Sequence, residues 1–97
     1  MSKITYKYTL DSKVLDKIAL PKGAIVTGCL LQNDKDLVIY ALIDDDIKDI
    51  EIRSFKVYAT GERINEDVKQ FIGTFLACGY LVFHLYELHT IADGFRI

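Results

Sequence analysis

The segment Phe71–His89 constrains the fold of this chain most strongly, because two runs rich in Val, Ile, Phe and Tyr flank the pair Cys78-Gly79. These residue types favour strands, and a glycine at the break between two such runs is typical of a tight turn. The second run has the period of a strand, in which Leu81, Phe83 and Leu85 alternate with Val82, His84 and Tyr86. The segment therefore predicts a β-hairpin with one core-facing side and one mixed face that carries polar groups.

The rest of the chain repeats this pattern. Strand-like runs cover residues 3–10, 14–20, 24–32, 37–43 and 50–59, and turn-forming groups separate them, including Asp11–Lys13. About seven short strands predict an all-β fold, a small antiparallel sandwich or open barrel, as a single domain over residues 1–97. Residues 65–70 are compatible with one short helix or a loop, and a change of phase near Ser54 predicts a β-bulge.

Composition limits the classes of function. The formal net charge of -2 supplies no general attraction to a nucleic-acid backbone, which disfavours binding of duplex DNA or RNA. The sequence contains neither a signal-peptide pattern nor a run approaching the roughly 18 apolar residues of a membrane helix, so we expect a cytosolic protein without a membrane partner. Cys29 and Cys78 belong to no metal or redox spacing and are expected to be reduced. Because hydrophobic residues make up 51% of the chain, part of its surface is expected to contact another copy or a ligand.

Signatures of catalysis, metal binding and cofactor binding are faint. The sequence has no GxxxxGK[ST], GxGxxG or GxSxG motif, and we assign no cofactor and no catalytic residue. His84 and His89 fall on opposite faces of a strand, and the acidic run Asp44–Asp46 lacks the spacing of a calcium loop, so no metal site is expected. An enzyme would use His84 as a general base with acid help from Glu87, whereas a structural or ligand-binding histidine is the alternative.

Three short segments have the residues of a small-ligand site. The pair Thr60-Gly61 with nearby Arg63, and the pair Gly73-Thr74, combine close backbone approach with donors for phosphate oxygens, although both pairs also occur in ordinary turns and strand ends. Tyr6-Lys7-Tyr8 places aromatic rings beside a cation, which suits a nucleobase and a phosphate, although sheet packing with an exposed lysine is the simpler explanation. Since Lys7 points to the face opposite the two tyrosines, a single pocket needs a partner strand or a second subunit.

These segments also occur in a recognisable order. Over residues 4–88 the chain resembles a large family of small bacteriophage proteins in the segments Tyr6–Tyr8, Leu20–Ala24, Val57–Gly61, Ile72–Phe75 and Leu81–Glu87. The resemblance implies an anti-CBASS sponge, a homo-oligomer that sequesters the cyclic dinucleotide signals of bacterial immunity without cleaving them. Family members often carry Gly-His after the Thr-Gly pair, where this chain has Glu62-Arg63, so a contact made by that histidine is in doubt. Residues 90–97 lie outside the shared pattern.

We therefore expect a phage immune-evasion protein that sequesters a cyclic dinucleotide, or a related nucleotide messenger, in the cytoplasm of the infected bacterial host. The expected roles are stacking for Tyr6 or Tyr8, base-edge hydrogen bonding for His84, and phosphate contact for Lys7, Thr60, Gly61, Arg63, Gly73 and Thr74. Two alternatives stay open. One is a protein-interaction or virion-associated module that recruits a host protein through exposed strand edges. The other is a cyclic-nucleotide hydrolase.

Overall fold

The computed structural model describes residues 2–11 and 15–89 and confirms the predicted all-β class. Within these residues there is no helix, and the strands are β1 (Lys3–Thr9), β2 (Leu15–Pro21), β3 (Ile25–Gln32), β4 (Asp36–Asp44), β5 (Ile50–Ala59), β6 (Val68–Ala77) and β7 (Leu81–Leu88). All of their pairings are antiparallel, as expected for strands joined by tight turns. The predicted turn at Asp11–Lys13 lies mostly outside the described residues, as does the tail 90–97.

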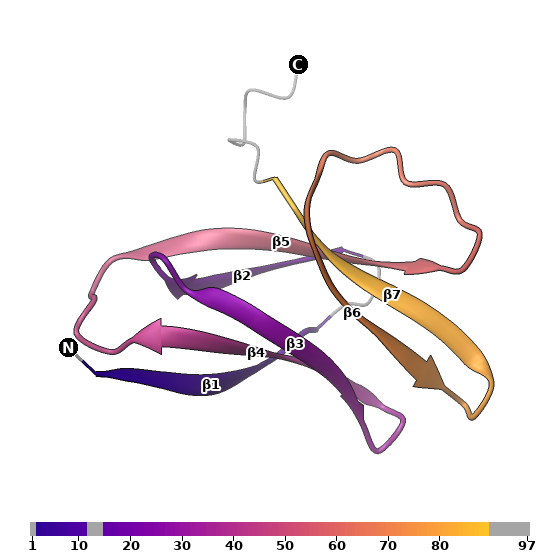
Figure 1. The fold of residues 1–97 in the computed structure, drawn as a ribbon, viewed down its shortest axis with the longest axis horizontal. Coiled ribbons are helices and arrows are strands. Elements are labelled where there is room, and N and C mark those ends of the chain that lie inside the picture. Colours follow the sequence, from indigo (N-terminus) through magenta and orange to yellow (C-terminus); the bar gives the residue numbers. More distant parts are fainter. Residues whose placement is uncertain (1, 12–14, 90–97) are drawn as a thin grey trace.

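The described strands form two sheets that pack face to face (Figure 1). Sheet A has the order β1-β4-β3, and sheet B has the order β2-β5-β7-β6. The two sheets approach each other most closely where β3 runs beside β6. Alternate residues of the strands point between the sheets and form one apolar core: Leu10, Leu20, Ala24, Val26, Leu37, Ile39, Ala41, Ile43, Phe55, Phe75 and Leu85. Each sheet therefore also has an outer face, which in sheet B is partly covered, since Ser54, Tyr58 and Leu88 are buried there.

The hairpin predicted at Cys78-Gly79 is confirmed. Cys78 and Gly79 have φ angles of 55° and 81°, and the amide of Tyr80 donates to the carbonyl of Ala77, which is the geometry of a type I′ turn. Asn33 and Asp34 form the equivalent turn between β3 and β4, with φ angles of 54° and 56°. The carboxylate of Asp34 accepts a hydrogen bond of 2.7 Å from the amide of Cys78, which ties the tips of the two hairpins together.

Two local expectations are decided by the strand register. Residues 65–67 form an irregular segment and Val68 begins β6, so the loop alternative is correct for 65–67 and no helical turn forms. The β-bulge predicted near Ser54 is wrong, because both ladders of β5 stay in register there. Arg53, Ser54 and Phe55 are all buried, and this cover on both faces of the strand explains the mixed pattern. The register shifts lie instead in β3 and β6.

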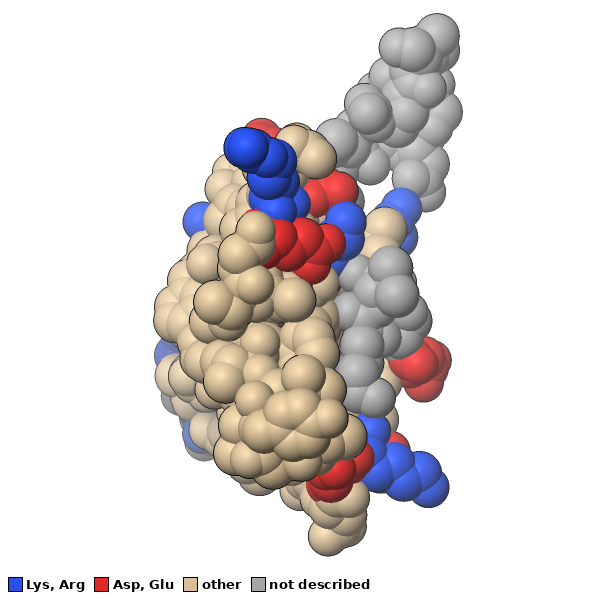
Figure 2. All heavy atoms as spheres, turned by 90° about the vertical axis from the view of Figure 1, so that its right-hand side faces the viewer, with Lys and Arg blue, Asp and Glu red and all other residues tan. Residues whose placement is uncertain are grey.

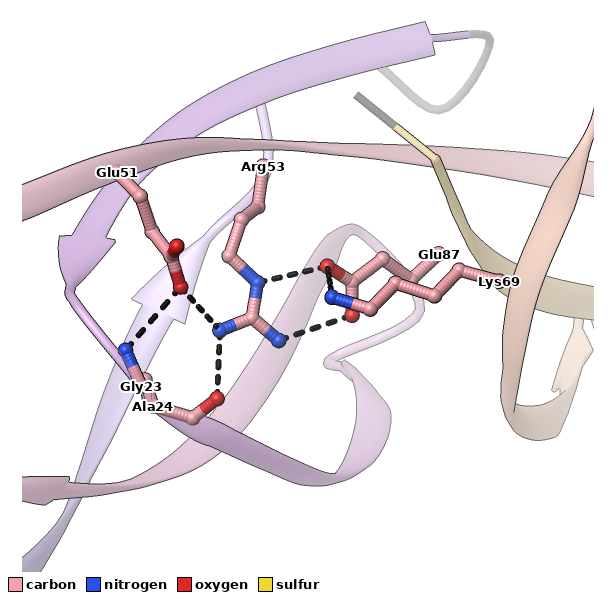
Figure 3. A network of polar contacts seen from close by, with 6 residues as sticks. All are labelled: Gly23, Ala24, Glu51, Arg53, Lys69 and Glu87. Carbon is pink, nitrogen blue, oxygen red and sulfur yellow. Dashed lines mark hydrogen bonds and ion pairs between the residues drawn. The ribbon is translucent and has the colours of Figure 1, made fainter. Parts of the chain in front are cut away.

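A buried ion pair lies on the inner face of sheet B (Figure 3). Arg53 on β5 donates to both carboxylate oxygens of Glu87 on β7, with N–O distances of 2.6 and 3.0 Å, and both residues are almost fully buried. Arg53 also donates to the carbonyl of Ala24 and to Glu51, and Glu51 accepts from the amide of Gly23. Hydrogen bonds to Glu87 raise the pKa of the Arg53 guanidinium despite its burial. This network connects sheet B to the turn between β2 and β3.

As for membranes, none of the residues that the structure describes belongs to a helix long and apolar enough to span one.

Candidate functional site

The outer face of sheet B brings together three residues that the sequence predicted separately. His84 on β7 is paired with Tyr58 on β5 and with Thr74 on β6, so these side chains share one row on one face. The Oγ1 atom of Thr74 lies 3.0 Å from His84 Nδ1, and the Oγ1 atom of Thr60 lies 2.8 Å from His84 Nε2. We call Thr60, Thr74 and His84 the hydroxyl–imidazole cluster.

The cluster is a continuous chain of hydrogen bonds. The hydroxyl of Thr60 donates to the carbonyl of Val82, with an O–O distance of 3.4 Å. With a proton on Nε2, His84 donates to Thr60 and its Nδ1 atom accepts from the hydroxyl of Thr74, so every group has a partner. His84 is half-buried, whereas the two threonines are exposed. The imidazole ring therefore holds two solvent-facing hydroxyl oxygens in fixed positions, and a hydroxyl proton reaches a ligand acceptor only by turning away from Val82 or His84.

A shallow hollow of about 400 Å³ adjoins this cluster. It is lined by Ala59, Thr60, Tyr80, Leu81, Val82 and Phe83, from the end of β5 and the start of β7. Tyr80 is 76% exposed and offers an aromatic ring at the edge of the hollow. The view onto this end of the molecule shows a broad face without charged side chains, with charges gathered around its rim (Figure 2). An apolar hollow beside two fixed hydroxyl groups is suited to a ligand with a flat ring and a polar or anionic part.

The β5–β6 loop, residues Thr60–Asp67, is fastened to the outer face of sheet B beside the cluster. The carboxylate of Glu66 accepts hydrogen bonds from the hydroxyl of Tyr58 at 2.5 Å and from Lys56 Nζ at 2.8 Å. The hydrogen bond from Lys56, followed by that from Tyr58, lowers the pKa of Glu66 to about 2. Burial, and then the hydrogen bond to Glu66, raises the pKa of the Tyr58 phenol. The carboxylate of Glu66 is therefore ionised at neutral pH and lies among positive and polar donors.

A row of aromatic rings extends from this loop across sheet B. The ring of Tyr58 contacts that of Tyr86 edge-on at a centroid distance of 5.7 Å, and Tyr86 contacts Phe71 at 5.3 Å. The ammonium of Lys56 lies 5.1 Å from the centroid of the Tyr58 ring, within the range of a cation–π contact. The rings and the loop together frame one side of the hydroxyl–imidazole cluster.

Two further predicted residues lie on the same loop. Gly61 follows Thr60 with a φ of 89°, a conformation that favours glycine and that turns the chain immediately beside the cluster. Arg63 is exposed on the loop. Glu62 accepts from the amide of Ala59 and closes this turn. The Thr-Gly segment is thus next to the cluster, and Arg63 lies on the same loop.

Gly73 lies on the opposite side of the sheet from its neighbour Thr74. A Cβ atom at Gly73 would lie 2.8 Å from the sulfur of Cys29 on β3. Successive residues of a strand point to opposite faces, so the predicted pair Gly73-Thr74 divides into an inner and an outer residue. Because residue 73 has no side chain, the two sheets can approach each other closely here. Gly73 does not lie beside the hydroxyl–imidazole cluster.

Tyr6, Lys7 and Tyr8 belong to β1 at the edge of sheet A, and the structure does not bring them to the cluster. Tyr6 and Tyr8 pair with Ala41 and Ile39 on the core-facing side of β4. Burial, and then the nearby Tyr6, raises the pKa of Tyr8. Lys7 lies on the outer face of the sheet and donates to the side chain of Gln32 at 3.3 Å.

The residues considered as a catalytic pair, His84 and Glu87, lie on opposite faces of β7, and the acidic run considered for metal binding lies elsewhere on the surface. Glu87 is held by Arg53 on the inner face of β7, whereas His84 points outward, so the proposed pairing of a His84 base with a Glu87 acid is not formed. The carboxylates of Asp44–Asp46 approach one another within 4.8 Å at the surface, and Asp44 accepts from the amide of Asp46. This hydrogen bond closes a local turn, which accounts for the cluster.

Sequence reasoning missed Lys56, Tyr58, Glu66 and Tyr80. Tyr80 had one signal, since a residue that directly follows a tight hairpin turn has its side chain at the exposed tip. The contact of Glu66 with Lys56 and Tyr58 depends on how the β5–β6 loop folds back, and no spacing in the sequence indicates it.

Comparison with known proteins identifies the family. The profile described as "Domain of unknown function (DUF7352)" matches residues 1–93, and the chain therefore belongs to the DUF7352 family. No curated protein matches the chain significantly. The same holds for the solved structures.

Proposed function

We propose that this protein binds and sequesters a cyclic dinucleotide, or a related nucleotide messenger of bacterial anti-phage defence such as CBASS, without cleaving it. The observation that supports this most directly is the hydroxyl–imidazole cluster beside an apolar hollow with an exposed tyrosine. The hydroxyl oxygens of Thr60 and Thr74 can accept from a base edge, or donate to phosphate oxygens once their protons turn away from Val82 and His84, and an exposed aromatic ring suits a nucleobase. Both halves of a nucleotide thus have a matching surface within one region of sheet B.

In this proposal the contacts are divided by chemistry. Thr60, Thr74 and the backbone at Gly61 contact phosphate oxygens, and Arg63 adds a charge-assisted contact. His84 orients the two threonines, and because both of its ring nitrogens are already hydrogen-bonded, the base-edge contact expected of His84 falls to the threonine hydroxyls. Tyr80 stacks on a base. The resemblance to phage sponges, drawn from the sequence, supports the same class of ligand, and in this proposal the protein acts in the cytoplasm of the infected host.

Self-association is part of the proposal. Leu76, Leu81 and Val82 are exposed apolar side chains beside the hollow, and the hollow is open to solvent on one side. A second copy that covered these side chains would close the pocket and remove apolar surface from water. Tyr6, Lys7 and Tyr8 lie on the other sheet, so they contribute to a pocket only across such an interface.

The test of the proposal is a sequestration assay. The purified protein is mixed with each of a panel of cyclic di- and trinucleotides and cyclic ADP-ribose isomers, and the free messenger is measured by liquid chromatography. We expect one class of messenger to disappear from solution and to return intact after heat denaturation of the protein. Recovery of a linear product would show a nuclease instead, and a panel that stays entirely free in solution would contradict the proposal.

A second candidate is a module that binds a host protein, and the uncharged face around the β6–β7 turn favours it (Figure 2). Size-exclusion chromatography with and without host lysate separates the two candidates. A host-protein module forms a larger complex in lysate and leaves every messenger free, whereas a sponge captures the messenger in the absence of lysate.

A further inference from the structure

The carboxylate of Glu66 accepts hydrogen bonds from a lysine ammonium and a tyrosine hydroxyl, two donors that are suited to an anion. Its two oxygens accept from different groups, one from the Tyr58 hydroxyl at 2.5 Å and one from Lys56 Nζ at 2.8 Å. An ammonium and a hydroxyl that converge on two oxygens of one anion form the same arrangement that binds a phosphate group. Lys56 and Tyr58 therefore form an anion cradle that the protein's own carboxylate occupies.

Glu66 is placed so that it can leave this cradle without disturbing the core. Its side chain is 38% exposed, and it lies on the β5–β6 loop rather than in a strand. The side chain of Lys56 is 21% exposed, whereas Tyr58 is only 1% exposed, so an anion reaches the Tyr58 hydroxyl only after Glu66 has moved aside. An incoming anion that offers more than one oxygen competes for the same two donors, and its contacts must outweigh the stability that the Glu66 contacts contribute.

The cradle is next to the hydroxyl–imidazole cluster. Tyr58 is paired directly with His84, and Lys56 is paired with Tyr86 in the next row of the same face. Rows two residues apart along a strand are separated by about 6.7 Å. The cluster and the cradle, each with donors for an anion, thus lie in neighbouring rows. The β5–β6 loop contributes Thr60 to the cluster and Glu66 to the cradle.

We propose that Lys56 and Tyr58 form a second phosphate subsite, and that Glu66 is an internal competitor which a nucleotide with two phosphate groups displaces. This inference rests on the proposed function, because it assigns one phosphate to the hydroxyl–imidazole cluster and the other to the cradle. It follows that the protein distinguishes ligands with two phosphates from ligands with one, since only a ligand with two phosphates can contact the hydroxyl–imidazole cluster and displace Glu66 from the cradle at the same time.

The test compares Glu66→Gln with Glu62→Gln, which removes the same charge from the same loop. Calorimetry measures the affinity of each variant for inorganic phosphate, for 3′,3′-cyclic di-GMP and for 3′,5′-cyclic GMP. We expect E66Q to bind phosphate at least about fivefold more tightly than E62Q, and Lys56→Gln in the E66Q background to abolish this gain. Equal affinities of E66Q and E62Q would overturn the inference.

A second comparison does not depend on the folding of E66Q. Lys56→Gln in the otherwise unchanged protein should weaken binding of cyclic di-GMP at least about fivefold more than binding of cyclic GMP. Lys3→Gln, an exposed lysine of β1, should weaken neither selectively. A Lys56 that only fastens the loop would change both affinities by the same factor, which contradicts a second subsite.

The two proposals fail in different ways. If cyclic dinucleotides bind and depend on Thr74 but E66Q gains nothing, the subsite is wrong and the sponge stands. If no nucleotide binds, the proposed function fails, and the phosphate measurement on E66Q still decides whether the cradle takes an anion.

Discussion

The sulfur of Cys29 lies 2.8 Å from the position that a Cβ atom would take at Gly73. These residues belong to β3 and β6, the strands along which sheets A and B meet. Real Cβ atoms do not approach other atoms so closely, so a side chain at position 73 would force the Cys29 sulfur to turn away or the two sheets to separate. Glycine at this position thus serves the packing of the sheets, while the next residue, Thr74, serves the outer face.

Gly73→Ala should destabilise the protein by about 1–3 kcal/mol, the usual cost of overpacking a core. Urea denaturation measures this change. Gly28→Ala is the matched control, because a Cβ atom there meets nothing within 4 Å, and it should have little effect. Cys29→Ala removes the obstructing sulfur, so G73A should cost less in a Cys29→Ala background. Additive effects of the two substitutions would refute the close contact.

The buried pair Arg53–Glu87 leads to a second prediction. Glu87→Gln leaves a buried guanidinium without its carboxylate and should cost about 3–5 kcal/mol in unfolding free energy. The control Glu51→Gln removes a more exposed partner of the same guanidinium and should cost about 1 kcal/mol or less. The double variant Arg53→Met with Glu87→Leu should be more stable than E87Q alone, because it leaves no unpaired charge in the core. Equal costs for E87Q and E51Q would contradict the pairing.

The class of fold was predictable from the sequence because its signals are local. Alternation along each strand and turn residues between the strands indicated the elements, and the antiparallel arrangement followed from short connections. The order of strands in each sheet was not predictable. It depends on pairings such as β5 with β7, in which the partners are separated by another strand along the chain.

The candidate site was predictable only as separate residues. Thr60, Thr74 and His84 were singled out for their chemistry, but their contact depends on the register that pairs His84 with Thr74 and on the end of β5. Gly73 was assigned to a ligand because a glycine in a strand serves a ligand or another strand equally well. Arg53 and Glu87 had no local signal at all, because each charge is acceptable in the core only through its partner.

The carboxylate of Glu66 predicts a pH dependence of stability. Its pKa is lowered from 4.5 to about 2 in the folded protein. A lowered folded-state pKa contributes stability that is fully present above pH 4.5 and is lost as the pH falls toward 2. The difference in unfolding free energy between the wild type and E66Q should therefore shrink across this range. Urea denaturation at several pH values measures it, and a difference that stays constant below pH 4.5 would contradict the contact with Lys56 and Tyr58.

The last prediction concerns the exposed hydroxyl of Thr74. Thr74→Val keeps the branched shape that suits a strand and removes only the hydroxyl, so the fold should persist. The affinity for the captured nucleotide should fall at least about tenfold, because a hydrogen bond to a charged phosphate contributes about 1.5–3 kcal/mol. Calorimetry measures the affinity, and thermal unfolding confirms the fold. Thr5→Val is the matched control, since Thr5 is also exposed but lies on β1 of sheet A. Because Thr5 is remote from the hydroxyl–imidazole cluster, T5V should bind as the wild type does, and equal affinities of T74V and T5V would remove the cluster from the site.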